Sequence, residues 1–293
     1  MRSDYPVPMK YLYDLHSHST ASDGTLSPAE LVKRAHSNGV DVLALTDHDS
    51  TEGVAEAEEM ALRLGVDLVP GVEVSVSWDP YVIHVVGLGV DTACQELQQG
   101  LLRLREQREE RAIEMGRRLQ QRGIEGAYEG AKALCNGDLI SRSHFARFLV
   151  EKGHVDDLSK VFRKYLVSGK PGYVPGNWAS LEEVVTWIKA AGGQAVIAHP
   201  ARYPFTRTKL RNLLGEFKEL GGEAIEVVSG NYTRDNCLTM ARHARDFELM
   251  GSVGSDFHGP EHSRIEIGRM MELPDRVVPI WHNWNQPELA ASL

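Results

Sequence analysis

The chain of 293 residues has few cysteines and no long apolar run. Its three cysteines, Cys94, Cys135 and Cys237, are widely spaced and form no CxxC pair. This pattern argues against a disulfide framework and against a thiolate zinc site, so we expect reduced thiols. The sequence also lacks an apolar run of the ~18 residues that a membrane span requires, and its first residues hold no apolar signal segment. We therefore expect a cytoplasmic protein with no membrane partner.

Positive charge is also scarce. Lys and Arg number 32 against 41 Asp and Glu, which gives a formal net charge of −9. A broad surface for extended duplex nucleic acid is therefore not expected, because such surfaces place many Lys and Arg side chains on phosphates. A small anionic ligand at a local site is compatible with this balance. The sequence contains neither a GxSxG nucleophile elbow nor a P-loop, so it offers no nucleophile or phosphate loop of those types.

Short β-like runs alternate with helix-like segments in two blocks of the chain. The predicted strands cover residues 11–15, 40–45, 66–69, 82–90, 195–198, 224–228 and 249–253. This alternation is typical of βα units that form a parallel sheet. Between the two blocks lies a long, charged stretch with helical spacing of its apolar residues and no strand signal, which indicates an inserted helical subdomain.

Twelve histidines are present, and six of them lie beside predicted strands. Five follow a strand and the sixth, His84, begins one, so His84 reaches the same rim only if its strand runs in the opposite direction. Three carboxylates accompany these histidines. The nine residues are His16, His18, Asp23, His48, Glu73, His84, His199, Asp256 and His258. Ligands of parallel α/β sheets and barrels bind at the carboxyl ends of the strands, so these side chains are expected to converge.

Burying nine such groups together without partners is costly, whereas divalent cations offset the repulsion of the carboxylates and the lost hydration. The HxH spacing of His16 and His18 places both imidazoles on one face of an extended segment. Nitrogen and oxygen donors without thiolate suit Zn, Mn or Fe, and a carboxylate such as Glu73 can bridge two ions. We predict a site for two or three divalent metals that hydrolyses phosphoric esters by attack of a metal-bridging hydroxide.

Six motifs occur in a fixed order: DLHSHSTASDGTLSP, LTDHDS, PGVEVS, IHVVGLGVD, VIAHPARY and GSDFH. In this the chain resembles the PHP (polymerase and histidinol phosphatase) domain family of the amidohydrolase superfamily. Two further motifs, ISRSHFARFLV and GKPGYVP, look most like the subgroup of 3′,5′-nucleotide bisphosphate phosphatases, whose enterobacterial members are called RNase AM. The resemblance implies an α/β fold, a distorted (βα)7 barrel with an inserted helical cap. We assign residues 10–95 and 178–275 to the barrel and residues 96–177 to the cap.

The resemblance also implies which residues bind each metal ion. One ion would be held by His16, His18, Glu73 and Asp256; Glu73 would bridge to a second ion at His84 and His199; Asp23, His48 and His258 would hold a third. Many relatives have His at the position of Asp23, so the third site would be weaker or of different identity here. Glu73, Asp256 and His84 are the residues we expect to be catalytic. Mn²⁺ is the expected metal, with Zn²⁺ or Fe²⁺ as alternatives.

Members of the resembled subgroup remove the 3′-phosphate from nucleoside 3′,5′-bisphosphates, such as adenosine 3′,5′-bisphosphate, and leave the 5′-nucleotide. They are also similar to exoribonucleases that cleave short single-stranded RNA from its 5′ end. One pocket serves both substrates if the 5′-phosphate is anchored away from the metals. Bidentate contact with arginine is the strongest phosphate contact. The predicted substrate-binding residues are Arg142, His144, Lys170 and Arg202.

Two other functions stay open at this point. The protein could be a phosphatase of another small monoester, such as histidinol phosphate, and a 5′-phosphate on the substrate would then be irrelevant. It could instead be a non-enzymatic, metal-binding PHP module with a regulatory or structural role. The second alternative is disfavoured because no ligand position is lost and no polymerase segment is attached.

Overall fold

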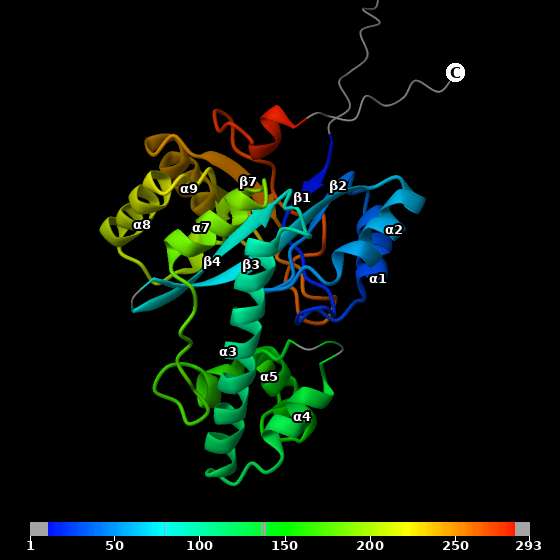
Figure 1. The fold of residues 1–293 in the computed structure, drawn as a ribbon, viewed down its shortest axis with the longest axis vertical. Helices are drawn as coiled ribbons and strands as arrows, with labels where there is room; N and C mark the ends of the chain where they lie inside the picture. The colour runs from blue at the N-terminus through cyan, green and yellow to red at the C-terminus, as the bar shows by residue number, and fades with distance from the viewer. Residues whose placement is uncertain (1–10, 79, 136, 138, 285–293) are drawn as a thin grey trace, which may run out of the picture.

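The computed structural model describes residues 11–78, 80–135, 137 and 139–284, so residue 10 of the predicted barrel lies outside it. Seven strands form one sheet whose order follows the chain from β1 to β7 (Figure 1). They are β1 (Tyr13–Asp14), β2 (Val42–Leu45), β3 (Asp67–Trp78), β4 (Tyr81–Leu88), β5 (Gln194–Ile197), β6 (Ala224–Ser229) and β7 (Met250–Gly254). The backbone N–H of Leu15 donates to the carbonyl of Val253 at 3.0 Å, which brings the first and last strands together. The sheet is therefore a nearly closed barrel, as predicted.

Five helices cover the outside of the barrel (Figure 1). They are α1 (Pro28–Ser37), α2 (Val54–Leu64), α7 (Leu181–Ala190), α8 (Arg207–Glu219) and α9 (Arg234–Asp246). Local sequence explains where they begin: Ser27 caps α1 in a capping box with Glu30, and Pro28 occupies the first turn. On α8, Leu210, Leu213 and Phe217 are buried on one face. Each helix thus covers the sheet with an apolar face, as an α/β barrel requires.

Strands β3 and β4 depart from the parallel pattern. They pair in antiparallel fashion along a hairpin that ends with Trp78 opposite Tyr81, and β4 is also antiparallel to β5. The predicted third strand, 66–69, was therefore too short, and Glu73 lies within β3 rather than after it. Because β4 runs in the opposite direction, its beginning lies at the rim where the parallel strands end. His84, at the beginning of β4, therefore lies at the same rim as the other histidines, as expected for a strand that runs in the opposite direction.

The segment between β4 and β5 is helical. It contains α3 (Gln95–Gln120), α4 (Ala127–Ala133), α5 (Arg142–Glu151), α6 (Leu158–Val161) and a π-helical turn, Phe162–Leu166. Figure 1 shows α3 projecting from the barrel toward α4 and α5 of the insert. The first turns of α3 bury Leu97 and Leu101 in the barrel core, whereas Leu119 packs farther along with Phe145 and Leu149 of the insert. Helix α3 therefore joins two hydrophobic cores, and the division at residue 96 stays a prediction.

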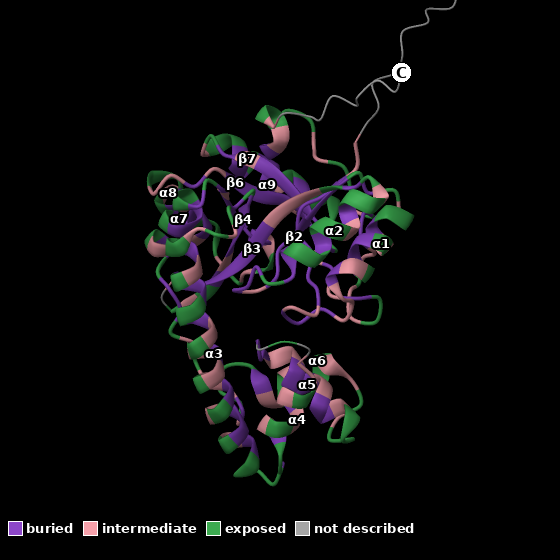
Figure 2. Ribbon diagram, turned by 45° about the vertical axis from the view of Figure 1, so that its right-hand side comes forward, coloured by how far each residue is buried: buried purple, intermediate pink, exposed green. Residues whose placement is uncertain are grey.

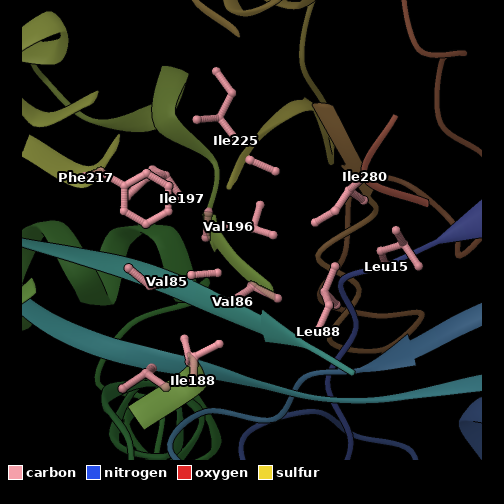
Figure 3. Close-up of a cluster of buried hydrophobic side chains, with 14 of the residues drawn as sticks. Leu15, Val85, Val86, Leu88, Ile188, Val196, Ile197, Phe217, Ile225 and Ile280 are labelled. Carbon is pink, nitrogen blue, oxygen red and sulfur yellow. The ribbon is translucent and has the colours of Figure 1, made fainter. Parts of the chain in front are cut away.

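Buried residues form one group in the barrel and another in the helical insert (Figure 2). In the barrel, Val85, Ile188, Ile197 and Phe217 are fully buried between the sheet and its helices (Figure 3). Interiors of this kind are close-packed, so the barrel can hold the side chains at its rim in fixed positions. No helix in the described ranges is long and apolar enough to cross a membrane.

Two short 3-10 helices complete the described chain, η2 (Pro200–Arg202) at the rim and η3 (Ile280–Asn283) near the C-terminus. The ring of Trp281 stacks on Tyr13 with centroids 4.2 Å apart, and the indole N–H of Trp284 donates to Gln194 at 2.6 Å. The C-terminal segment therefore packs back on the barrel beside β1 and β5.

Candidate metal centre

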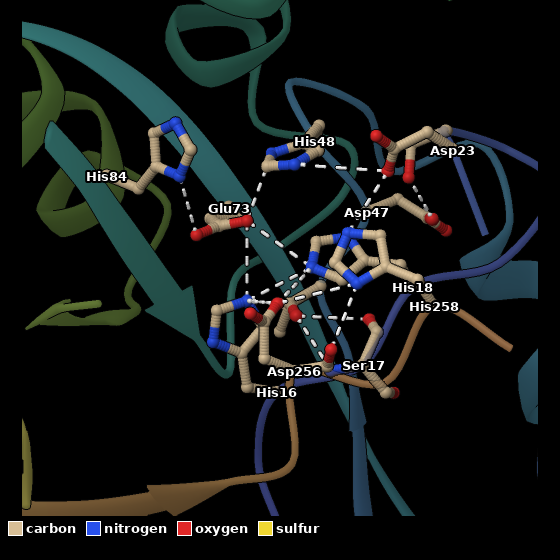
Figure 4. A network of polar contacts seen from close by, with 12 residues as sticks. His16, Ser17, His18, Asp23, Asp47, His48, Glu73, His84, Asp256 and His258 are labelled. Atoms are coloured by element: carbon tan, nitrogen blue, oxygen red, sulfur yellow. Dashed lines mark hydrogen bonds and ion pairs between the residues drawn. The ribbon is translucent and has the colours of Figure 1, made fainter. Parts of the chain in front are cut away.

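The nine side chains proposed as ligands meet at one rim of the barrel, and Glu73 lies at their centre (Figure 4). Its Oε2 atom is 3.3 Å from Nε2 of both His16 and His18. Its Oε1 atom is 2.9 Å from Nδ1 of His84 and 3.0 Å from Nε2 of His199. The two oxygens of one carboxylate thus face different sets of imidazoles. This is the arrangement that a carboxylate bridging two ions requires.

The structure groups the donor atoms into three overlapping sets, each with all atoms within 4.8 Å of one another. The sets are His16, His18, Glu73 and Asp256; His18, Asp23, His48 and His258; and His48, Glu73 and His84. The first coincides with the set that the family resemblance implied. The second adds His18 to the implied set, and the third contains His48 in place of His199. The three sets share His18, His48 and Glu73, so the donor atoms form one connected cluster and not three separate sites.

Several of these atoms are buried without a hydrogen-bond partner. Oε2 of Glu73, Oδ1 of Asp23 and Nδ1 of His199 all lack one. A buried polar atom that makes no hydrogen bond costs about 1–3 kcal/mol, and more when it is charged. A cation at each group would satisfy the oxygens and offset the repulsion between the carboxylates. The donor set therefore fits divalent metals.

The charges of the protein alone shift the pKa values in this cluster strongly. Burial works to lower the pKa of His18, but Asp256 and Glu73 raise it to about 10. Burial works in the opposite direction on Glu73, and His84 and His16 hold its pKa well below the usual value. Glu73 therefore stays ionised, and the imidazole of His18 holds a proton when no cation replaces it. Cations and protons compete for the same donors.

Backbone strain is concentrated at this rim. Asp49, His199 and Asp256 have positive φ values of 46°, 34° and 54°, which non-glycine residues rarely adopt. The backbone N–H of Asp256 donates to the carbonyl of His16 at 2.9 Å, which helps to hold this conformation. Outliers of this kind cluster at functional sites, where the surrounding structure determines them.

The sequence interpretation missed one residue that orients the ligands, Glu226 on β6. Nδ1 of His16 donates to its Oε1 at 2.5 Å, and the backbone N–H of His199 donates to its Oε2 at 2.6 Å. The first bond leaves Nε2 of His16 facing Glu73 and Asp256, and the second holds the strained backbone of His199. A carboxylate in this position fixes the tautomer of a metal-binding histidine. A glutamate within the apolar run AIEVVS was the available signal.

The cap contacts the rim through residues of both α5 and α3. Oγ of Ser141 donates to Oδ2 of Asp23 at 3.1 Å, which connects α5 to one proposed ligand. From α3, the buried guanidinium of Arg108 pairs with Asp49 at 2.5 Å and donates to Oγ of Ser75 at 2.8 Å. The insert is therefore connected directly to the segments that carry the ligands.

The four predicted substrate-binding residues lie in different surroundings. Arg202 pairs with the carboxylate of Asp256 at the rim, and Lys170 is exposed on the loop after the π-helical turn. His144 is buried, and its Nδ1 accepts a hydrogen bond from the backbone N–H of Ser141 at 3.0 Å. Burial lowers the pKa of His144 to about 4, so its imidazole is neutral. Because Nδ1 accepts this bond, the N–H of the neutral ring lies on Nε2, and the assignment of His144 to the substrate stays a prediction.

Arg142 lies in a cluster of three arginines that sequence reasoning did not predict. Burial and the charges of Arg142 and Arg108 lower the pKa of Arg111 to about 9. Burial and Arg108 also lower the pKa of Arg142. Within the described residues Arg108 pairs with Asp49, whereas Arg111 and Arg142 have no carboxylate partner. The excess positive charge suits an anion. Arg108 and Arg111 lie about one turn apart on α3, and Arg142 lies on α5, so no short motif marked all three.

A nearly closed α/β barrel with mixed His and carboxylate donors along one rim defines a class of metal-binding barrel proteins, in which the loops at one face carry the site. Residues 14–196 match the PHP domain family. The chain belongs to this family, as the motifs predicted.

Relatives of known description cover nearly the whole chain. A protein of Chromobacterium violaceum named 3′,5′-nucleoside bisphosphate phosphatase is 50% identical over 92% of this chain and 94% of its own length. A protein of Haemophilus influenzae named 5′-3′ exoribonuclease is 46% identical over 93% of this chain and 98% of its own length. A solved structure of an amidohydrolase from Chromobacterium violaceum, with bound sulfate and no metal, has a TM-score of 0.89 and 49% identity. It covers 92% of this chain and 94% of that one.

Proposed function

We propose that the protein is a metal-dependent phosphoesterase that removes the 3′-phosphate from nucleoside 3′,5′-bisphosphates and leaves 5′-nucleotides. The same site hydrolyses short, 5′-phosphorylated RNA in the 5′-to-3′ direction. The observation that carries this proposal is the position of the arginine cluster, Arg108, Arg111 and Arg142, beside a rim of metal-binding donors. The names of two relatives at 46% and 50% identity support both activities.

The rim residues provide the reacting end of the site. The nine proposed ligands would hold two or three divalent ions, for which Mn²⁺ is our choice and Zn²⁺ or Fe²⁺ the alternatives. When bound, such ions stabilise charge on phosphoryl oxygens and lower the pKa of water. Glu73 keeps the ion sites adjacent, and Glu226 orients His16. Arg202, which pairs with Asp256 at the rim, would contact the phosphate that is hydrolysed.

The arginine cluster provides the other end. Arg142 and Arg111 would bind the 5′-phosphate, and Lys170 would approach from the exposed loop that leads to Tyr173. Burial makes each charge-assisted hydrogen bond to the phosphate stronger than it would be in water. His144 is left out of this anchor because it caps α5 and is neutral.

Anchoring the 5′-phosphate at the cap explains why one site accepts two kinds of substrate. The phosphorus atom on the 3′ oxygen then lies at the rim, whether that phosphate is terminal or joins a second nucleotide. The histidinol-phosphatase alternative has no use for two partly buried arginines that lack a carboxylate partner among the described residues. The non-enzymatic alternative has no use for a phosphate anchor beside metal-binding donors.

The proposal is tested by identifying the product that the Mn²⁺-loaded protein forms from adenosine 3′,5′-bisphosphate. We expect the products to be inorganic phosphate and 5′-AMP, which phosphorus NMR distinguishes from 3′-AMP. No reaction is expected when a chelator is present. Formation of 3′-AMP, or hydrolysis that persists with the chelator, would contradict the proposal. Faster hydrolysis of histidinol phosphate than of the bisphosphate would favour the alternative monoester phosphatase.

A further inference from the structure

A row of aromatic side chains leads from the metal centre to the outer surface of the barrel. It consists of Tyr203, Phe205, Tyr81 and Trp78, which we call the aromatic row. Consecutive ring centroids are 5.2 Å apart between Tyr203 and Phe205 and 4.8 Å between Phe205 and Tyr81, and Trp78 is 5.5 Å from Phe205. All four side chains are only partly buried. The row therefore joins the loop before α8 to the end of the β3–β4 hairpin.

The row begins at two of the proposed metal ligands. The ring of Tyr203 lies 5.4 Å from that of His199, and its hydroxyl accepts a hydrogen bond from the backbone N–H of His84 at 2.8 Å. In Figure 4, His84 lies at one end of the ligand cluster and Asp23 at the other. Asp23 is the ligand that contacts the cap. The aromatic row thus leaves the centre at His84 and His199, whereas the arginine cluster contacts it through Arg108 at Asp49 and Ser75.

Positive charge accompanies the exposed end of the row. Nζ of Lys209 lies 4.1 Å from the ring centroid of Tyr81 and 6.0 Å from that of Trp78. Arg207 is exposed in the same turn of α8 and lines a groove of about 570 Å³ together with Tyr203 and Phe205. Within the described residues neither Lys209 nor Arg207 forms an ion pair with a carboxylate. This local charge contrasts with the net charge of −9 of the chain.

Aromatic faces next to cations are the surfaces on which proteins bind single-stranded nucleic acid, because every base can stack and every phosphate is negative. The aromatic row begins at His84 and His199, so an RNA whose first internucleotide phosphate lies at the rim can continue from there onto the row. We propose that the aromatic row binds the nucleobases that lie 3′ to the hydrolysed phosphate. This inference rests on the proposed function and assigns a binding site for the part of the RNA that leaves the metal centre.

Nucleoside bisphosphates have no nucleotide beyond that phosphate, so the two substrates should respond differently to changes in the row. The test compares kcat/KM for a 5′-phosphorylated hexanucleotide with kcat/KM for adenosine 3′,5′-bisphosphate. For Tyr81→Ala we expect a loss of about tenfold or more on RNA and less than about twofold on the bisphosphate. Tyr81→Phe, which keeps the ring, should retain the RNA activity. An equal loss on both substrates, or no loss on either, overturns the proposal.

Lys209→Ala should act in the same direction through the RNA phosphates, and its effect should weaken as salt concentration rises. Lys218→Ala is the matched control, because this lysine lies at the other end of α8 and donates to the backbone carbonyl of Glu248 at 2.7 Å. We expect it to leave both activities unchanged. If Tyr81→Ala and Lys209→Ala instead changed the sedimentation coefficient and neither activity, the row would be a contact between two copies of the chain, and the proposal would be wrong.

Binding measurements separate this inference from the proposed function. Labelled 5′-phosphorylated RNAs of two to six nucleotides are titrated with the protein in the presence of a chelator, and affinity is followed by fluorescence anisotropy. We expect affinity to increase with each added 3′ nucleotide in the wild type, and to increase much less in the Tyr81→Ala, Lys209→Ala double variant. Equal length dependence in the two proteins overturns the inference even if hydrolysis is intact. Failure to hydrolyse the bisphosphate bears on the proposed function alone.

Discussion

The metal rim and the arginine cluster of the cap hold opposite charges, and their partners differ accordingly. At the rim, the carboxylate of Glu73 lies within 3.3 Å of five histidines, His16, His18, His48, His84 and His199. Of the three arginines in the cluster, only Arg108 has a carboxylate partner within the described residues, whereas Arg111 and Arg142 have none. The rim is thus arranged to bind cations and the cap to bind an anion. A substrate with a phosphate near each end connects the two regions.

Removing the central carboxylate of the rim should have the largest effect. Glu73→Gln keeps the shape of the side chain but removes the charge that all five histidines face. We expect kcat to fall about a thousandfold or more, as for residues that act as one unit with their neighbours. Bound metal, measured by mass spectrometry, should fall below the wild-type stoichiometry. A variant that retained both full activity and full metal content would show that Glu73 is not a ligand.

A substitution at Glu226 tests whether metal binding at the rim depends on a residue that orients the ligands. Glu226→Gln should weaken metal affinity about 10–100-fold, because His16 loses the charged acceptor that fixes its orientation. The measurement is a metal titration of the chelator-treated protein, together with kcat at saturating metal. We expect kcat to recover largely at high metal concentration. An unchanged metal affinity would leave Glu226 with a role in packing alone.

Arg142 tests the cap against the rim. Arg142→Ala should lower kcat/KM for adenosine 3′,5′-bisphosphate about tenfold or more, which corresponds to a lost charge-assisted contact of about 1.5–3 kcal/mol. Metal content should not change. Arg163→Ala is the control, because Arg163 is an exposed arginine of the same insert. If the two variants behave alike, Arg142 is not part of the anchor.

The smallest effect on activity is expected at His144, which we interpret as a structural residue of the cap. Its pKa is lowered to about 4 in the folded protein, whereas the ordinary pKa of histidine is about 6.5. Between these two pH values the unfolded chain binds a proton at His144 and the folded protein does not. Stability from this residue is therefore present above about pH 6.5 and is lost as the pH falls toward about 4. Between about pH 7 and pH 5 the loss is about 1–2 kcal/mol.

The measurement for His144 is urea unfolding of the wild type and of His144→Gln at the two pH values. Part of the pH dependence should disappear in the variant, while kcat/KM for the bisphosphate near pH 7 stays within about twofold. A large loss of activity with unchanged pH dependence would return His144 to the substrate site.

The rim could be predicted from the sequence because its signals are local. His16, His48 and Asp256 each follow a strand that an apolar run marks, and the βα pattern places such positions at one edge. The position of His84 depended on the direction of β4, which the hairpin pairing of β3 with β4 decides. That pairing arises from tertiary contacts. From the sequence alone, we could say only that His84 would reach the rim if its strand ran in the opposite direction.

The arginine cluster could not be predicted in the same way. Arg108 and Arg111 lie on one face of α3 within a run of charged residues, which reads equally well as a solvated helix surface. They meet Arg142 only because α3 and α5 contribute to the same hydrophobic core of the insert. The role of His144 as a cap could not be predicted for a related reason: it depends on the hydrogen bond with Ser141 and on burial of the side chain.

The central claim is that the cap recognises the 5′-phosphate while the rim acts on the 3′-phosphate. The most direct test is the ratio of kcat/KM for adenosine 3′,5′-bisphosphate to that for 3′-AMP, measured with the metal-loaded wild type and with Arg142→Ala. We predict a ratio of about ten or more in the wild type and a ratio that falls toward one in the variant. Equal kcat/KM for the two substrates in the wild type would contradict the account.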